Sequence, residues 1–231
     1  MTFTDGAQCT ANFVFTDAAG RVYLGQAAHC AGTGATQTDG CQAGSLPLGT
    51  PVEVQGATRP GRLAYSSWLT MQARGERDPA TCAYNDFALV ALDAADVGRV
   101  NPTVPFWGGP TGLDTRGTAV GDTVLSYGNS SLRLGVSALS PKQGISLGDA
   151  GGGWSHRVYT ATPGIPGDSG SAFLAADGQA LGVLATLALA PWAGSNGVGD
   201  LSRELGYAQA YGGIAGLGLA LGTEPFRGPL P

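Results

Sequence analysis

The stretch Gly164-Ile165-Pro166-Gly167-Asp168-Ser169-Gly170-Ser171 places one serine between glycines in a segment typical of a tight turn. Glycine adopts backbone conformations that other residues avoid, so a turn of this composition can expose the serine hydroxyl. It can also leave backbone N–H groups free to face an oxygen that becomes negatively charged. Ser169 is therefore the candidate nucleophile, and a base that accepts its proton is the next requirement.

Only two histidines, His29 and His156, could supply that base. Imidazole is the usual proton acceptor for a serine near neutral pH. His29 follows the apolar run 21–27 and precedes Cys30, a position that can fix its ring. No histidine follows Ser169, which excludes the chain order of the α/β-hydrolases. We interpret His156 as a strand-end histidine that faces solvent, with a pocket-lining role as the alternative.

Asp86 begins a strongly apolar run at 86–92. A carboxylate in such a place is costly to remove from water unless another group pairs with it. A histidine N–H is a natural partner. The three candidate residues therefore occur in the chain order His29, Asp86, Ser169.

The composition favours a folded chain with many short strands and tight turns. Its 231 residues include 39 glycines and 14 prolines, together about twice their average share. A disordered chain would need low hydrophobicity and high net charge, whereas the apolar fraction is 43% and the formal net charge is −5. One helix is predicted over 200–211, capped by Asp200 and ended by Gly212-Gly213. The predicted strands are 12–15, 21–27, 51–55, 62–69, 86–92, 123–127, 133–139, 157–162, 171–175 and 182–188.

Charge and hydropathy exclude two classes of partner. The sequence has an isoelectric point near 4.8 and no cluster of Lys and Arg, which argues against nucleic acid. Its apolar stretches are far shorter than the roughly 20 residues of a membrane-spanning helix. The residues 1–9 have neither the basic start nor the apolar core of a signal peptide.

The four cysteines form no C-x-x-C pair, which argues against a zinc site or a redox motif. Cys9 and Cys30 flank two strand-like runs joined by the turn 17–20, so a hairpin would place them opposite each other. Cys41 and Cys82 would then form a second disulfide. Disulfides persist in oxidising compartments, which predicts a secreted protein. The alternative is four reduced thiols packed in the core.

Three motifs together resemble the chymotrypsin/trypsin superfamily of serine proteases, in its bacterial secreted branch. They are Ala27-Ala28-His29-Cys30, Asp86-Phe87-Ala88-Leu89-Val90 and Gly167-Asp168-Ser169-Gly170-Ser171. A Cys9–Cys30 bridge also matches the disulfide that this family places behind its histidine. The resemblance implies two six-stranded antiparallel β-barrels and a C-terminal helix. Residues 1–108 would carry the histidine and aspartate, and residues 109–231 the serine, the helix and a tail.

The resemblance also implies the role of each residue. His29 would take the proton of Ser169, Asp86 would hold the imidazole, and the N–H groups of Gly167 and Ser169 would form the oxyanion hole. Pro163 stands where trypsin-like relatives carry an acidic group, which predicts an apolar or aromatic side chain at P1, the residue before the cleaved bond. The alternative is that Glu204, Asp200 or a loop residue reaches the pocket. The substrate-binding residues would be Pro163, Gly164, Pro166, Ala185, Thr186 and Leu187.

The predicted function is a secreted, monomeric serine endopeptidase that acts on polypeptides and needs neither a metal nor another cofactor. Two alternatives stay open, a catalytically silent relative that binds proteins through the same cleft and a serine esterase on the same fold. The partner of Asp168 is also open at this stage. It could be an arginine or an amino terminus released by processing.

Overall fold

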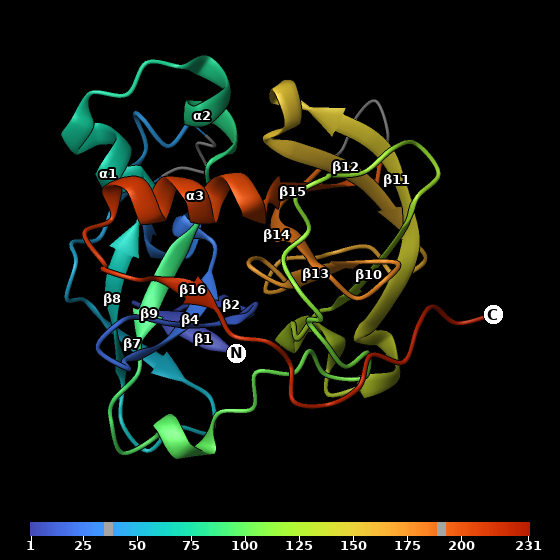
Figure 1. The fold of residues 1–231 in the computed structure, drawn as a ribbon, viewed down its shortest axis with the longest axis horizontal. Coiled ribbons are helices and arrows are strands. Elements are labelled where there is room, and N and C mark those ends of the chain that lie inside the picture. Colours follow the sequence, from blue (N-terminus) through green and yellow to red (C-terminus); the bar gives the residue numbers. More distant parts are fainter. Residues whose placement is uncertain (35–38, 189–192) are drawn as a thin grey trace.

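The computed structural model describes residues 1–34, 39–188 and 193–231. These residues form two β-structured halves that lie side by side, with the longest helix crossing the front between them (Figure 1). The C-terminal segment turns back over the first half before it reaches the second.

The first half is one antiparallel sheet of eight short strands in the order β16-β3-β4-β9-β8-β7-β1-β2. Within the described residues no ladder joins the edge strands β2 and β16, so the closed six-stranded barrel predicted for this half is not shown. Its strands are β1 (Thr2–Thr4), β2 (Ala7–Cys9), β3 (Val14–Thr16), β4 (Val22–Gln26), β7 (Pro51–Val54), β8 (Gly61–Ser66), β9 (Ala88–Ala91) and β16 (Gly218–Leu219).

The second half is a closed barrel of six antiparallel strands, which confirms the prediction for this half. Apolar side chains from five of its strands fill the interior: Val124, Val158, Phe173, Leu181, Leu184 and Val198. The strands, in order around the barrel, are β10 (Thr123–Tyr127), β11 (Pro141–Ala150), β12 (Ser155–Thr160), β15 (Asn196–Asp200), β14 (Ala180–Leu187) and β13 (Ala172–Ala175).

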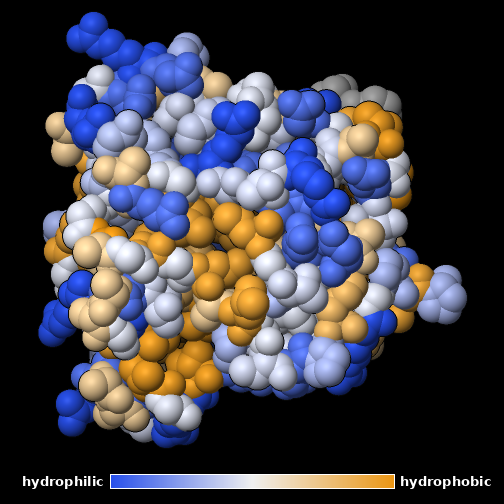
Figure 2. All heavy atoms as spheres, viewed as in Figure 1, coloured by the Kyte–Doolittle hydropathy of each residue, from blue (hydrophilic) through white to orange (hydrophobic). Residues whose placement is uncertain are grey.

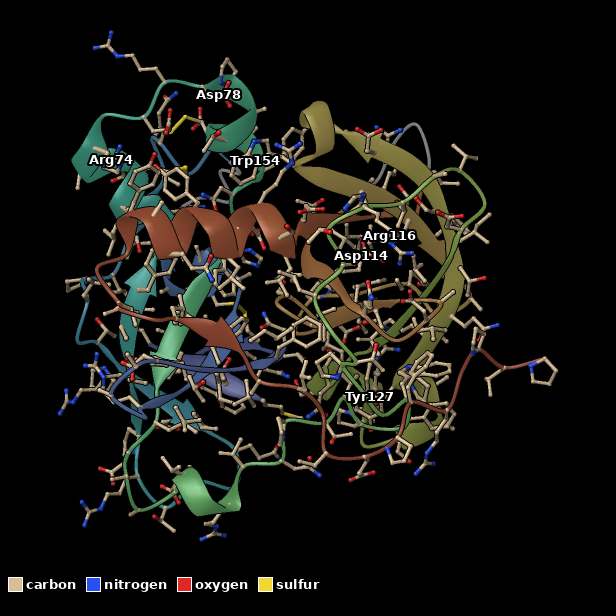
Figure 3. The ribbon with its side chains drawn as sticks, in the orientation of Figure 1. Arg74, Asp78, Asp114, Arg116, Tyr127 and Trp154 are labelled. Carbon is tan, nitrogen blue, oxygen red and sulfur yellow. A yellow bond between two sulfur atoms is a disulfide. The ribbon has the colours of Figure 1, made fainter. Side chains whose placement is uncertain are left out.

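Helix α3 (Leu201–Tyr211) confirms the predicted C-terminal helix. Asp200 caps it by accepting a hydrogen bond from the Arg203 N–H, and Gly212 ends it. Figure 3 shows Trp154, which follows β11, beside the start of α3. Its carbonyl accepts a hydrogen bond of 2.9 Å from the Asp200 N–H. The β11–β12 turn is thereby tied to the helix.

Two further helices were not predicted, α1 (Ser67–Arg74) and α2 (Pro79–Tyr84). Helix α1 ends at Gly75 in the left-handed conformation, and α2 begins at an Asp78 cap followed by proline. None of the helices in the described part of the chain has the length and hydropathy to cross a membrane.

The strand predicted over 133–139 is wrong. The segment instead contains the end of one 3₁₀ turn, Ser131–Arg133, and a second, Ser137–Leu139. Its apolar side chains are not buried against a sheet, since Leu134 is 88% exposed and Leu139 is 42% exposed. The adjacent β11 was missed because its sequence, PKQGISLGDA, lacks the apolar alternation of a strand.

The main hydrophobic core extends across both halves. It joins Phe87 beside β9 to Leu125 on β10 and Leu205 on α3. Trp107 belongs to the same core, and its indole N–H donates to the Ser126 carbonyl over 2.6 Å. On the face with α3, Figure 2 shows apolar residues gathered below the helix, around β16. The two halves therefore share one packed core.

Candidate active site

A cleft of about 780 Å³ contains all three candidate catalytic residues. His29 and Asp86 come from the first half of the chain, and Ser169 comes from the second. The cleft is also lined by Trp68 and Tyr84 on one side and by residues of β14 and β15 on the other. The sequence prediction that these three residues gather in one place therefore agrees with the geometry.

His29 and Asp86 form a close, well-aligned pair. The imidazole Nδ1 lies 2.6 Å from Asp86 Oδ2, and Asp86 Oδ1 accepts the His29 backbone N–H over 2.8 Å. The two bonds fix both the ring and the backbone of the histidine. About 28% of the His29 side chain is exposed against 11% of Asp86. The imidazole is therefore accessible from the cleft, while the carboxylate is shielded behind it.

The environment of His29 raises its pKa above the ordinary value of 6.5. Burial by itself lowers the pKa, because it disfavours the charged ring. The charge of Asp86 and its hydrogen bond outweigh that effect. The pair therefore stabilises the protonated imidazole, which is the state that forms when a base has taken a proton.

The backbone of Asp86 is itself held by hydrogen bonds at its N–H and at its carbonyl. Its N–H donates to Glu204 Oε1 on α3 over 3.0 Å, and its carbonyl accepts the Ala28 N–H over 3.2 Å. Burial, with smaller contributions from Asp86 and Asp200, raises the pKa of Glu204 well above its ordinary value. The sequence offered Glu204 only as a residue that could reach the specificity pocket, but it is not among the residues that line the cleft, and its contact with Asp86 was not predicted.

The turn that carries Ser169 is bound to the first half by three hydrogen bonds. The Thr10 N–H donates to the Ser169 carbonyl over 2.8 Å, and the Thr10 hydroxyl donates to the Gly167 carbonyl over 2.8 Å. The Asn12 amide donates to the Gly170 carbonyl over 3.0 Å. Sequence reasoning missed both Thr10 and Asn12, whose partners lie more than 150 residues away.

The same contact explains the glycine after the serine. Gly170 has a φ of +86°, and a Cβ there would lie 2.6 Å from the Thr10 carbonyl oxygen and 2.9 Å from the Ala27 N. Thr10 is next to Cys9, which forms a disulfide with Cys30, the neighbour of His29. A short covalent and hydrogen-bonded path therefore links the serine turn to the histidine.

Two N–H groups beside Ser169 are available to a ligand. Neither the Gly167 N–H nor the Ser169 N–H donates a hydrogen bond to any of the described residues. Gly167 has a φ of +92°, a conformation that favours glycine. The described residues also show no hydrogen bond between Ser169 Oγ and the His29 ring. Such catalytic hydrogen bonds are often long until a substrate binds.

Asp168 is fully buried and pairs with two cations, Arg133 and Lys142. The Lys142 Nζ lies 3.1 Å from Asp168 Oδ2, and Asp168 Oδ1 accepts the Ser130 N–H over 3.0 Å. Burial, together with the nearby charge of Arg133, lowers the pKa of Lys142 despite the opposing effect of Asp168. Of the two partners left open by the sequence, arginine is the one found. The lysine was not anticipated.

Most of the predicted substrate-binding residues line the cleft, but Pro163 does not. Its carbonyl instead accepts hydrogen bonds from Arg133 and Lys142, each over 3.2 Å. Pro163 therefore contacts the buried cations Arg133 and Lys142 and is not among the residues that line the cleft. The predicted substrate-binding residues that do line the cleft are Gly164, Pro166, Ala185, Thr186 and Leu187. Asn196, which the sequence did not indicate, also lines it.

His156 does not face solvent as predicted, and it is not among the residues that line the cleft. It is 1% exposed, with Nε2 2.9 Å from Asp200 Oδ2 and Nδ1 3.2 Å from the Thr118 hydroxyl. Asp200 also caps α3. The histidine therefore joins β12 to the start of that helix, which explains its burial.

All four cysteines form disulfides, Cys9–Cys30 and Cys41–Cys82. This is the pairing that the hairpin at 17–20 favoured. The second bridge joins the 39–43 turn to α2. Four reduced core thiols are thereby excluded.

Comparison with known proteins identifies the fold. No family model matches the sequence, and no curated protein does. Thermobifida fusca Protease A matches in structure with a TM-score of 0.58 at 18% identity, covering 96% of each chain. The Nocardiopsis protease matches with a TM-score of 0.54 at 18% identity, covering 95% of this chain and 96% of that one.

The chymotrypsin of Cellulomonas bogoriensis is similar to the same extent, with a TM-score of 0.52 at 18% identity over 95% of this chain and 94% of that one. Likeness at such identity concerns the fold. The chain has the fold of the bacterial chymotrypsin-like serine proteases, with a closed second barrel and a C-terminal helix.

Proposed function

We propose that the protein is a secreted serine endopeptidase that uses Ser169 as nucleophile, His29 as base and Asp86 as the group that orients the base. The observation that carries the proposal is the 2.6 Å contact between His29 Nδ1 and Asp86 Oδ2 in the cleft that Ser169 also lines. The two disulfides support an oxidising compartment.

The proposed reaction begins when Ser169 Oγ attacks the carbonyl carbon of a peptide bond. His29 Nε2 takes the hydroxyl proton and later gives it to the leaving amine. Asp86 holds the other ring nitrogen, so that Nε2 presents its lone pair to the serine. The N–H groups of Gly167 and Ser169 receive the negative oxygen that develops on the carbonyl. Water then releases the acyl group by the same steps.

The walls of the cleft support an apolar side chain at P1. Gly164, Ile165 and Pro166 line one side, and Ala185 and Leu187 line the other. The buried cations Arg133 and Lys142 are paired with Asp168 and lie behind Pro163. Neither cation is therefore presented as the partner of an acidic substrate residue.

A fluorophosphonate tests the nucleophile and the base, because it phosphonylates only an activated serine. Intact mass spectrometry is expected to show one adduct, and peptide mapping is expected to place it on Ser169. Ser169→Ala serves as the blank, and His29→Ala is expected to lose labelling while it stays folded. A folded wild-type protein without an adduct would favour the binding-only alternative. Matched peptide and ester substrates would then separate a protease from an esterase.

The pH dependence of labelling gives a second test. His29 acts as a base only when it is neutral, and Asp86 raises its pKa above 6.5. The rate is therefore expected to rise with pH along a limb centred above 6.5. Asp86→Asn removes the effects that raise the pKa and leaves the burial that lowers it. The limb is expected to move to lower pH in that variant, and an unchanged limb would contradict the assignment.

A further inference from the structure

The side chain of Asn196 on β15 joins the two walls of the cleft. Its Nδ2 donates to the Gly164 carbonyl over 3.2 Å and to the Thr186 carbonyl over 3.1 Å, while its Oδ1 accepts the Gly164 N–H over 2.8 Å. Gly164 lies on the segment that leads to Ser169, and Thr186 lies on β14 opposite. The amide therefore spans the space in which a P1 side chain would lie.

Leu184 fills the same space from β14. A Cβ placed on Gly164 would lie 2.7 Å from Leu184 Cδ2 and 3.0 Å from Asn196 Nδ2. Leu184 and Asn196 are 3% and 1% exposed, yet both line the cleft. The two side chains thus pack directly beneath Gly164 and leave no room for even one added carbon at that point.

An incoming side chain could not easily push Asn196 aside. The amide uses both of its N–H donors and its oxygen in the three bonds to the walls. Moving it without replacing these bonds would leave buried polar groups unpaired, which is unfavourable. The barrier at the inner end of the cleft is therefore a fixed part of the structure.

We propose that Asn196 and Leu184 close the inner end of the P1 pocket, so that the enzyme accepts small aliphatic side chains such as alanine and rejects aromatic ones. This inference rests on the proposed protease function and narrows its apolar preference to one substrate class. One methylene more or less in an apolar pocket typically changes the ratio of kcat/KM between two substrates by roughly 10- to 200-fold. We expect kcat/KM to be at least about tenfold higher after alanine than after phenylalanine.

The test uses chromogenic tetrapeptides that share P2–P4 and differ only at P1, with alanine, valine, phenylalanine or glutamate. Leu184→Ala is the main variant, because it enlarges the pocket and leaves the Asn196 bonds in place. It is expected to raise the Phe-to-Ala ratio of kcat/KM by at least about tenfold. Asn196→Gly should shift the ratio in the same direction.

Leu181→Ala is the matched control. Leu181 is on the same strand and in the same barrel core as Leu184, but it is not among the residues that line the cleft. Its removal should lower stability without changing the Phe-to-Ala ratio. An equal change of the ratio in both variants would overturn the inference, because it would reflect a general loosening of the barrel.

A small fluorophosphonate, which needs no P1 side chain, counts the active serines in every sample. A wild-type enzyme that is labelled at Ser169 and prefers phenylalanine would overturn this inference alone. So would a preference for glutamate, since Arg157 also lines the cleft and would then be its partner. A folded protein without labelling would overturn the protease function itself and this inference with it.

Discussion

The two halves of the molecule hold their parts of the candidate site by different means. In the first half, an open sheet of short strands, His29 is next to Cys30, which is covalently bound to Cys9. In the second half, a closed barrel without cysteines, the Ser169 turn is built over the buried charges Asp168, Arg133 and Lys142. The first half therefore has a disulfide beside His29, and the second half has buried ion pairs behind Ser169.

Each half also holds a residue of the other. Thr10 of the first half bonds to the backbone of Gly167 and Ser169, and Glu204 of the second half bonds to the backbone of Asp86. The contacts are reciprocal, so a shift of one half against the other would disturb the positions of both Asp86 and Ser169. The following predictions separate these means of support.

The largest effect is expected on activity, when the first half keeps its fold and its disulfides but loses the charge of Asp86. Asp86→Asn should lower kcat/KM by about 10⁴, because the wrong imidazole tautomer faces Ser169 and the charged ring loses its partner. The unfolding midpoint should change little by comparison. Activity is measured on a P1-alanine peptide, with Ser169→Ala as the blank. A loss below about tenfold would mean that Asp86 does not orient the base.

In the second half, the largest loss of stability should follow from Asp168→Asn. The change leaves two buried cations, Arg133 and Lys142, without a countercharge. Breaking a buried ion pair in this way typically costs about 3–5 kcal/mol. Urea unfolding followed by tryptophan fluorescence measures the change.

Lys142→Met is the matched control for that prediction. It removes one of the two cations and leaves a neutral Arg133–Asp168 pair, and it relieves a lysine whose pKa is already lowered by burial. We expect a much smaller loss, or none, since apolar replacement of a buried charge is often neutral. Equal losses in the two variants would show that volume, and not charge balance, supports the serine turn.

The two disulfides can be compared, because Cys9–Cys30 lies beside His29 and Cys41–Cys82 does not include a neighbour of that residue. Replacing either pair by alanine should cost about 2–4 kcal/mol of stability, since the bridges close loops of comparable size, with sequence separations of 21 and 41 residues. Only the loss of Cys9–Cys30 should also lower kcat/KM at temperatures where the protein is folded, because that bridge lies beside His29. Equal activity in the two double variants would contradict a positioning role for this disulfide.

Local signals were enough to single out the three candidate residues that the structure brings into one cleft. A serine between glycines, a histidine beside a cysteine and an aspartate at the start of an apolar strand each stand out in the sequence. The helix over 201–211 was likewise marked by its cap and its final glycine. The second barrel followed from the resemblance that these motifs carry.

The supporting residues could not be predicted, because their roles depend on distant partners. Thr10 acts on a carbonyl more than 150 residues away, and Asn196 and Glu204 look like ordinary polar residues in sequence. Strand β11 was missed because its sequence lacks apolar alternation, and the helices α1 and α2 were missed although Gly75 and the Asp78 cap mark their ends. The division into residues 1–108 and 109–231 stays a prediction, and β16, at Gly218–Leu219, pairs with β3 of the first sheet.

The smallest effect, taken over one pH unit, concerns Glu204, where the two halves meet. The groups that face it are Asp86, Asp200 and Tyr65, and its pKa in the folded protein is well above 4.5. Between pH 4.5 and that raised pKa, the folded state binds a proton that the unfolded state has lost. Stability should therefore fall as pH rises, by at most about 1.4 kcal/mol per pH unit.

Glu204→Gln should remove this slope, because the amide oxygen can still accept the Asp86 N–H and carries no titrating proton. The variant should gain stability over wild type as the pH rises above 4.5, while Ser169 stays reactive. Glu76→Gln is the control, since its exposed carboxylate has a lowered pKa and is ionised in both states over that range. Urea unfolding at each pH gives the slopes. Parallel slopes in wild type and Glu204→Gln would contradict the raised pKa of Glu204, and the hydrogen bond from the Asp86 N–H would then be made to an ionised carboxylate.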